Sequence, residues 1–158
     1  MKQKAGLAVM ILLAVIMSTT IRERMPNPQD TFARPFEYSG NTAPGFGELG
    51  DVKAKLTDSV DGNRTTETFI EIQFGFTTSK YQRPPYATLV DGKNRDINPL
   101  RPPKCGSVQT GVPVTCTVGF EVARDATDNA VLRVHPGYSD SAAPVIVHPL
   151  TLEGGTNG

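Results

Sequence analysis

The sequence is poor in tryptophan, cysteine and histidine, and it lacks the common catalytic and phosphate-binding motifs. Its 158 residues include no tryptophan, only two cysteines and only two histidines. Its 16 basic and 16 acidic side chains give a formal net charge of zero, which argues against a nucleic-acid partner. There is no H-E-x-x-H spacing, no G-x-S-x-G elbow and no glycine-rich phosphate loop before a helix. We therefore expect a non-enzymatic protein with no catalytic, cofactor-binding or metal-binding residues.

Long hydrophobic runs are also absent, with one exception at the amino terminus. Residues 5–17 are all apolar, and the run continues to Ile21 before Arg22. Lys2 and Lys4 precede it. A basic segment followed by an apolar segment is the layout of an export signal. The sequence therefore predicts that the chain is exported and that the part after this run lies outside the cytoplasm.

The small residues that signal cleavage requires are poorly represented after the apolar run, where Ser18 offers the best position. No cysteine lies nearby, which excludes a lipoprotein route. A helix over residues 5–21 would span about 25 Å, within the range of membrane helices. We therefore predict an uncleaved signal-anchor at residues 1–24 and a single-pass protein of the cell membrane. The alternative is cleavage followed by secretion.

Residues 25–47 are rich in proline and glycine and show no helical or alternating period. They predict an extended linker, within which residues 34–38 are either plain linker or a first edge strand. From Met25 onward, 12 basic and 15 acidic side chains leave a net charge of −3. The part of the chain predicted to lie outside the cytoplasm is thus mildly acidic.

Helical periodicity is missing after Ile21, and alternation of apolar and polar residues takes its place. The 15 glycines and 13 prolines also disfavour a helical bundle. Alternation and turn signals predict strands around residues 52–56, 70–76, 86–90, 95–97, 116–122, 130–134 and 145–152. We expect an all-β, antiparallel immunoglobulin-like sandwich of six to seven strands over residues 48–153, with a tail at 154–158.

The two cysteines fit this prediction. A two-residue turn at Thr110-Gly111 places Cys105 directly opposite Cys116 in an antiparallel hairpin. Cα atoms of such opposed residues lie about 4.5 or 5.5 Å apart, within reach of a disulfide. Export supplies an oxidising compartment. The sequence therefore predicts a Cys105–Cys116 disulfide.

The order of these segments resembles a family of exported proteins. The residues that carry the resemblance are Arg34-Pro35-Phe36, the strand 69–76, Leu89-Val90-Asp91-Gly92, Thr110-Gly111 and Val118-Gly119-Phe120-Glu121-Val122. Together they resemble the telokin-like, immunoglobulin-like β-sandwich proteins that actinobacteria and other Gram-positive bacteria export and anchor in the membrane. Two positions depart from the family pattern, because Gly92 comes one place early and Thr110 replaces a proline. The resemblance implies a non-enzymatic protein of unknown function, and it assigns no site residues.

Three further groups are candidates for binding. His135 and His148 would bind a metal only if the fold brought them together with a third ligand. The acidic turns 58–63 and 125–129 are either calcium ligands or ordinary turns, of which turns are the simpler interpretation. Residues 80–104 combine tyrosines and prolines with six basic side chains, namely Lys80, Arg83, Lys93, Arg95, Arg101 and Lys104. They form either a contact region for a polyanion or partner protein, or a solvated edge.

These observations lead to one functional expectation. We expect a membrane-tethered, extracytoplasmic binding or accessory module of the bacterial cell envelope, with no cofactor. Its partners would be the membrane, through the N-terminal helix, and another envelope protein or a cell-wall component. The alternatives are a secreted carrier of small molecules and a metal-dependent hydrolase on the same scaffold.

Overall fold

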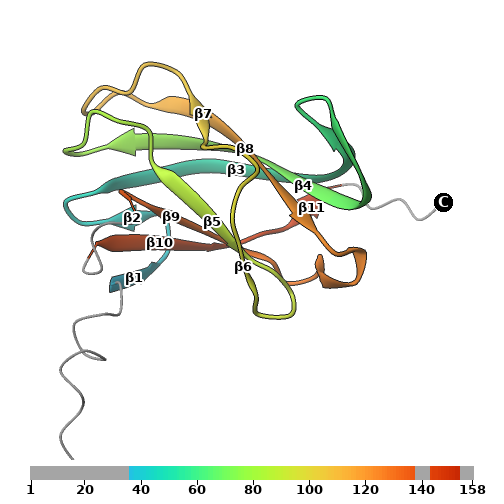
Figure 1. Ribbon diagram of the computed structural model, residues 1–158. Helices are drawn as coiled ribbons and strands as arrows, with labels where there is room; N and C mark the ends of the chain where they lie inside the picture. The colour runs from blue at the N-terminus through green and yellow to red at the C-terminus, as the bar shows by residue number, and fades with distance from the viewer. Residues whose placement is uncertain (1–35, 138–142, 154–158) are drawn as a thin grey trace, which may run out of the picture. The chain divides into compact units, whose positions relative to one another are not determined.

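Two β-sheets pack face to face in the computed structural model, which describes residues 36–137 and 143–153 (Figure 1). The five-stranded sheet has the order β1 (Phe36–Ser39), β10 (Pro144–Pro149), β9 (Val131–His135), β5 (Tyr86–Val90) and β6 (Asp96–Ile97). The six-stranded sheet has the order β11 (Leu152–Glu153), β3 (Gly47–Val60), β4 (Asn63–Thr78), β8 (Val114–Val122) and β7 (Lys104–Cys105), and β2 (Thr42–Ala43) pairs with β3. A short 3-10 helix, η1 (Arg124–Ala126), follows β8. The predicted all-β sandwich is therefore confirmed.

The core lies between the two sheets and follows the alternation in the sequence. In β4, Ile70, Ile72, Phe74 and Phe76 are each at most 1% exposed. Val118, Phe120 and Val122 of β8 join them from the same sheet, and the opposite sheet contributes Leu89, Leu132, Val134 and Ile146. Burial of these side chains is the main force that holds the sheets together.

The strand count and the strand directions differ from the prediction of six to seven antiparallel strands. The described residues form eleven strands, and two edge pairings are parallel: β1 with β10, and β11 with β3. The single strand predicted at residues 145–152 is in fact two strands, β10 and β11, in different sheets. The break follows Pro149, which has no N–H to continue the ladder, and the Leu150 N–H then bonds to the Ala130 carbonyl at 2.9 Å.

The segment 36–47 belongs to the sandwich, although its composition predicted a linker. It forms β1, β2 and the start of β3, and the side chains of Ala43 and Phe46 are only 1% exposed. The edge-strand alternative for residues 34–38 is supported by β1, since Phe36 pairs with Pro144. This partner lies so far along the chain that no local pattern could indicate it.

The β3–β4 hairpin is long, and its tip lies against the outer face of its own sheet. Asp61 and Gly62 have φ angles of 51° and 81°, which form the predicted tight turn. Next to this turn, Val60 packs on Gly119 of β8, and Asp61 pairs with Lys104 at 2.7 Å. The absence of a side chain at Gly119 is what allows this contact.

The connections alternate between the sheets in a regular way. The hairpins β3–β4, β5–β6, β7–β8 and β9–β10 each stay within one sheet, and the chain changes sheet between them. The two ends of the sandwich consequently carry different loops (Figure 1). We call the end where β1 begins the entry end. It also carries the loop after β4, the β7–β8 turn and residues 136–137, and the far end carries the β3–β4 and β5–β6 turns and η1.

Candidate functional site

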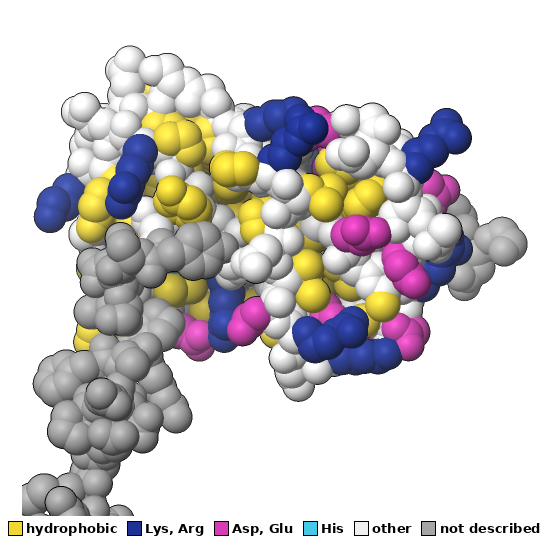
Figure 2. All heavy atoms as spheres, in the orientation of Figure 1, with side chains coloured by type: hydrophobic (Ala, Val, Ile, Leu, Met, Phe, Trp, Pro, Cys, Tyr) yellow, Lys and Arg dark blue, Asp and Glu magenta, His cyan; other side chains and the backbone are white. Residues whose placement is uncertain are grey.

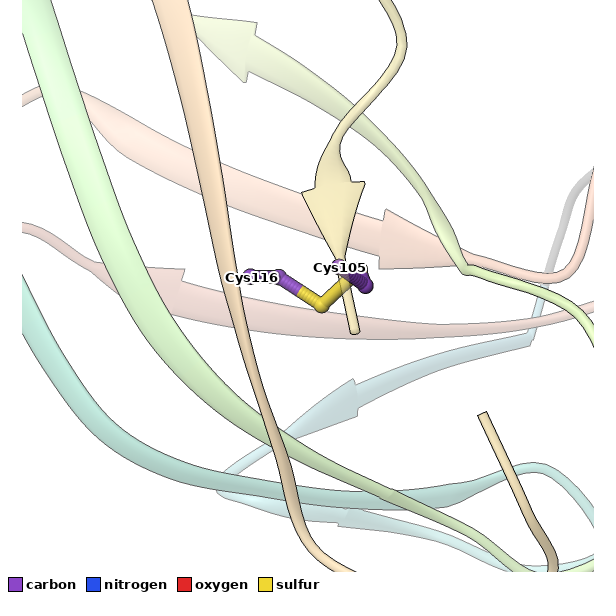
Figure 3. The surroundings of a disulfide bond; sticks show 2 residues. All are labelled: Cys105 and Cys116. Atoms are coloured by element: carbon purple, nitrogen blue, oxygen red, sulfur yellow. A yellow bond between two sulfur atoms is a disulfide. The ribbon is translucent and has the colours of Figure 1, made fainter. Parts of the chain in front are cut away.

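The predicted disulfide is present and joins two adjacent strands of the six-stranded sheet (Figure 3). Cys105 of β7 pairs directly with Cys116 of β8, and their Cα atoms are 4.1 Å apart. The turn at Thr110-Gly111 is also confirmed, because the Val112 N–H bonds to the Gln109 carbonyl at 3.1 Å and Gly111 has a φ of 76°. The bridge ties the two-residue strand β7 to the core, where Cys116 is fully buried.

The basic stretch of residues 80–104 does not form a single patch. Lys93 and Arg95 lie at the far end, where they pair with Asp125 and Asp91 at 2.5 and 2.7 Å. Lys104 pairs with Asp61 of the β3–β4 turn. Lys80 and Arg83 lie instead in the loop after β4, at the entry end. The fold therefore separates these residues and neutralises half of them.

Lys80, Tyr81 and Arg83 form a cation–aromatic group, the entry-end cluster. The Lys80 ammonium lies 5.9 Å and the Arg83 guanidinium 5.7 Å from the centroid of the Tyr81 ring. No ion pair joins either cation to an acidic side chain among the described residues. The upper left of Figure 2, at the entry end, shows basic side chains beside hydrophobic ones with no acidic side chain next to them.

Buried Thr78 positions this cluster. Its Oγ1 accepts hydrogen bonds from the N–H groups of Tyr81 at 2.9 Å and of Lys80 at 3.3 Å, and it donates to the Phe46 carbonyl at 3.4 Å. The Tyr81 ring makes an edge contact with Phe46, with the centroids 6.2 Å apart. Thr78 at the end of β4 and Phe46 just before β3 thus hold both the ring and the start of the loop in place.

The two histidines do not converge on a common site. His135 stacks on Tyr86 with ring centroids 5.9 Å apart. His148 pairs with Leu132, so its side chain lies on the inner face of the sheet. His135 is three residues from Leu132 and therefore lies on the outer face. Within the described ranges, no group of three or more His, Cys, Asp or Glu side chains could hold a metal ion.

Burial lowers the pKa of both histidines below the ordinary value of 6.5. For His135, a backbone hydrogen bond with Gly137 opposes this effect without overcoming it. Both rings are therefore neutral at pH 7.

The acidic segments 58–63 and 125–129, for which calcium binding was the alternative prediction, each have a carboxylate that pairs with a lysine. Lys104 lowers the pKa of Asp61, and Lys93 lowers the pKa of Asp125, in each case chiefly through a side-chain hydrogen bond. Asp61 forms the β3–β4 turn, and Asn129 has a φ of 56°, as expected for turn residues. The structure thus supports the interpretation of both segments as turns.

Asp91 is a buried carboxylate at the start of the β5–β6 turn. Its Oδ1 accepts from the N–H groups of Lys93 and Arg95, both at 2.9 Å, and its Oδ2 contacts the Arg95 Nε and Nη2 at 2.7 Å. Burial by itself would raise its pKa, but these hydrogen bonds outweigh burial and hold the pKa below 3.8. The carboxylate therefore organises the β5–β6 turn, and all of its partners lie within that turn.

A depression that sequence reasoning did not identify lies on the outer face of the six-stranded sheet and is lined by both polar and apolar groups. It comprises two adjoining hollows of about 300 and 370 Å³, which share Lys53 and Gln73. We call it the sheet hollow, and its other lining residues are Gly50, Asp51, Ala54, Lys55, Glu71, Phe74, Gly75, Pro113, Thr115, Thr117 and Glu153. The Phe74 side chain is fully buried, so no aromatic ring is exposed in this lining.

Two glycines that face each other create part of this hollow. A Cβ atom at Gly75 would lie 3.2 Å from the Gly50 Cα, and a Cβ atom at Gly50 would lie 3.3 Å from the Gly75 Cα. The register of β3 and β4 also shifts between Leu49 and Val52. The signal available in the sequence was a glycine in each of two strand segments, which is typical of a bulge or a close backbone approach.

Comparisons with protein families, with curated proteins and with solved structures found no match to this chain. Within the part of the chain that the structure describes, no helix is long and apolar enough to cross a membrane. The predicted signal-anchor at residues 1–24 and the predicted tail at 154–158 lie outside the described residues.

Proposed function

We propose that this protein is a membrane-tethered, extracytoplasmic binding or accessory module of the bacterial envelope, and that it is not an enzyme. The observation that carries the proposal is the Cys105–Cys116 disulfide in a chain with an export-like amino terminus. Disulfides persist mainly in oxidising compartments outside the cytoplasm. The uninterrupted apolar run of residues 5–17 and the poor cleavage positions after it favour retention in the membrane.

We also propose that the sandwich is immunoglobulin-like and related to the telokin-like exported proteins. The order β3-β4-β8-β7 corresponds to strands A-B-E-D of an immunoglobulin domain, and β10-β9-β5-β6 corresponds to G-F-C with the added C′ strand. The disulfide differs from that of antibody domains, because it joins neighbours in one sheet and not strands of opposite sheets.

The proposed binding surface is the sheet hollow, and the proposed ligand is a segment of another envelope protein. The hollow carries both charges: Lys53 and Asp51 are exposed, and Lys55 pairs with Glu71 at 2.6 Å. Its lining offers hydrogen-bonding side chains but no exposed aromatic ring on which a sugar could stack. These features favour a polar protein segment over a cell-wall glycan.

Fractionation tests the location. After a carbonate wash, the full-length protein should stay in the membrane pellet, and a thiol-reactive probe should find no free cysteine in the unfolded, unreduced chain. Release of the protein into the medium would favour the secreted alternative. Labelling of both cysteines in freshly isolated protein would contradict export to an oxidising compartment.

Site-specific photocrosslinking in native membranes tests the binding surface. A crosslinking residue in place of Lys53, inside the sheet hollow, should capture one defined envelope protein. The matched control is Asp96, an exposed position on the opposite sheet whose side chain is 75% exposed. Equal products from both positions, or none from either, would contradict binding at the hollow.

A further inference from the structure

The entry end of the sandwich carries an unusual combination of side chains. Phe36 and Val112 are two of the three large hydrophobic residues that are exposed in the described ranges, with exposed fractions of 66% and 46%. Phe36 begins β1, and Val112 lies in the β7–β8 turn. The entry-end cluster of Lys80, Tyr81 and Arg83 lies at the same end. Apolar, aromatic and cationic side chains together are typical of surfaces that contact a membrane interface.

We propose that the entry end docks on the anionic lipid surface of the membrane that holds the chain. Lys80 and Arg83 contact headgroup phosphates, and Phe36 and Val112 enter the interfacial layer. This inference rests on the membrane tether proposed above, and it adds an orientation of the domain and a class of lipid.

The first argument is where the chain enters the sandwich. If the membrane segment ends at Ile21, fourteen residues separate it from Phe36. Even a fully extended chain of that length spans no more than about 50 Å. Because Phe36 lies at the entry end, the proposed tether keeps this end of the domain close to the bilayer. The tether thereby gives the entry end a high effective concentration relative to the lipid surface.

The second argument is charge. Lys80 and Arg83 lack acidic partners among the described ion pairs, whereas Lys93, Arg95 and Lys104 have them. Cations near an anionic leaflet each raise the binding constant about fivefold. The exposed carboxylate of Glu48 also lies at the entry end, beside Thr77 of β4, but the two cations outnumber it. The far end exposes the additional carboxylates of Asp58, Glu67, Glu121 and Asp128, which outnumber the additional exposed cations Arg64 and Arg124 there. An anionic surface would therefore attract the entry end and repel the far end.

The absence of tryptophan in the natural chain makes a direct test possible. Single-tryptophan variants Val112→Trp at the entry end and Thr66→Trp at the exposed far end of β4 are made in the full-length protein. Each is reconstituted into vesicles of phosphatidylcholine with brominated acyl chains, with or without phosphatidylglycerol. The indole at position 112 should lose fluorescence in the anionic vesicles and much less in the neutral ones. The indole at position 66 should be unaffected in both.

Charge reversal supplies the matched control. Adding Lys80→Glu and Arg83→Glu to the Val112→Trp variant should abolish the quenching in anionic vesicles. Arg64→Glu with Arg124→Glu changes the net charge by the same amount at the far end and should leave the quenching intact. Quenching that is equal at positions 66 and 112, or independent of lipid charge, would overturn the docking proposal.

Flotation separates this proposal from the membrane tether. Retention of the protein in neutral vesicles after a carbonate wash reports the tether alone. If the protein is not retained there, the tether fails, but docking still predicts flotation with anionic vesicles that Lys80→Glu with Arg83→Glu abolishes. If the protein is retained but the quenching does not depend on lipid charge, the tether stands and docking fails.

Discussion

Several single residues stabilise this protein through a specific partner, by a hydrogen bond, an ion pair or a disulfide. Asp91 is the clearest example, because its side chain has no solvent exposure and all four of its partner atoms belong to its own turn. Cys105 and Cys116 close a 12-residue loop, which is expected to stabilise the fold by roughly 3 kcal/mol. The Asp91 hydrogen bonds and the disulfide both matter, because a few kcal/mol is a large share of the total stability of a small domain.

Replacing Asp91 with asparagine should therefore destabilise the protein. The amide oxygen can still accept the two backbone N–H groups, but an NH2 donor would replace Oδ2 and face the Arg95 guanidinium. We expect a loss of about 1–3 kcal/mol in the free energy of unfolding, measured by urea denaturation at pH 7. The control is Asp96→Asn, which removes an exposed ion pair with Arg133 and should cost less than about 1 kcal/mol. Equal losses for the two variants would show that burial of Asp91 has no energetic consequence.

At the scale of elements, close approaches between strands set the details of the fold. The tip of the β3–β4 hairpin lies on β8 because Gly119 leaves room for Val60. A Cβ atom at position 119 would lie 2.6 Å from the Val60 Cγ1, closer than van der Waals contact allows. The contact between this hairpin tip and the sheet therefore depends on one glycine.

A double-mutant cycle tests this contact. Gly119→Ala should cost roughly 1–3 kcal/mol of unfolding free energy through overpacking. Val60→Ala removes the clashing methyl groups, so the double variant should be more stable than the sum of the single effects predicts, by about 1 kcal/mol or more. Urea denaturation of the three variants measures this coupling. Strict additivity would show that Val60 and Gly119 are not in contact.

At the scale of the whole molecule, the histidines and the aspartates with shifted pKa values all act on stability in the same direction. The pKa values of His135, His148 and Asp91 are lower in the folded protein than their ordinary values, so the unfolded chain binds these protons more tightly. The stability that such groups contribute is present above the unfolded pKa and is lost as the pH falls through the folded pKa.

We therefore expect stability to fall in two stages on acidification. The histidine stage begins below about pH 6.5, and the carboxylate stage begins below about pH 4. Urea denaturation from pH 7.5 to pH 3 measures both. The variant His135→Phe with His148→Asn keeps an aromatic ring beside Tyr86 and should lose only the upper stage. An unchanged upper stage in this variant would mean that other groups cause it.

The sequence by itself determined the elements whose signal is local. Alternation from Ile70 to Phe76 identified the buried face of β4, Asp61-Gly62 identified a tight turn, and the Thr110-Gly111 turn placed Cys105 opposite Cys116. These features depend on neighbours within a few residues, where the period of side chains and the turn preferences act directly. The all-β sandwich follows from such local signals taken together.

Only the tertiary structure decided which distant segments meet. It placed β1 beside β10, moved the chain to the other sheet after Pro149, and separated His135 from His148. It also divided the basic stretch of residues 80–104, so that Lys93 pairs with an acid while Lys80 stays beside Tyr81. The physical reason is that edge pairing, ion pairing and burial depend on partners far apart in the chain, and no local periodicity encodes them.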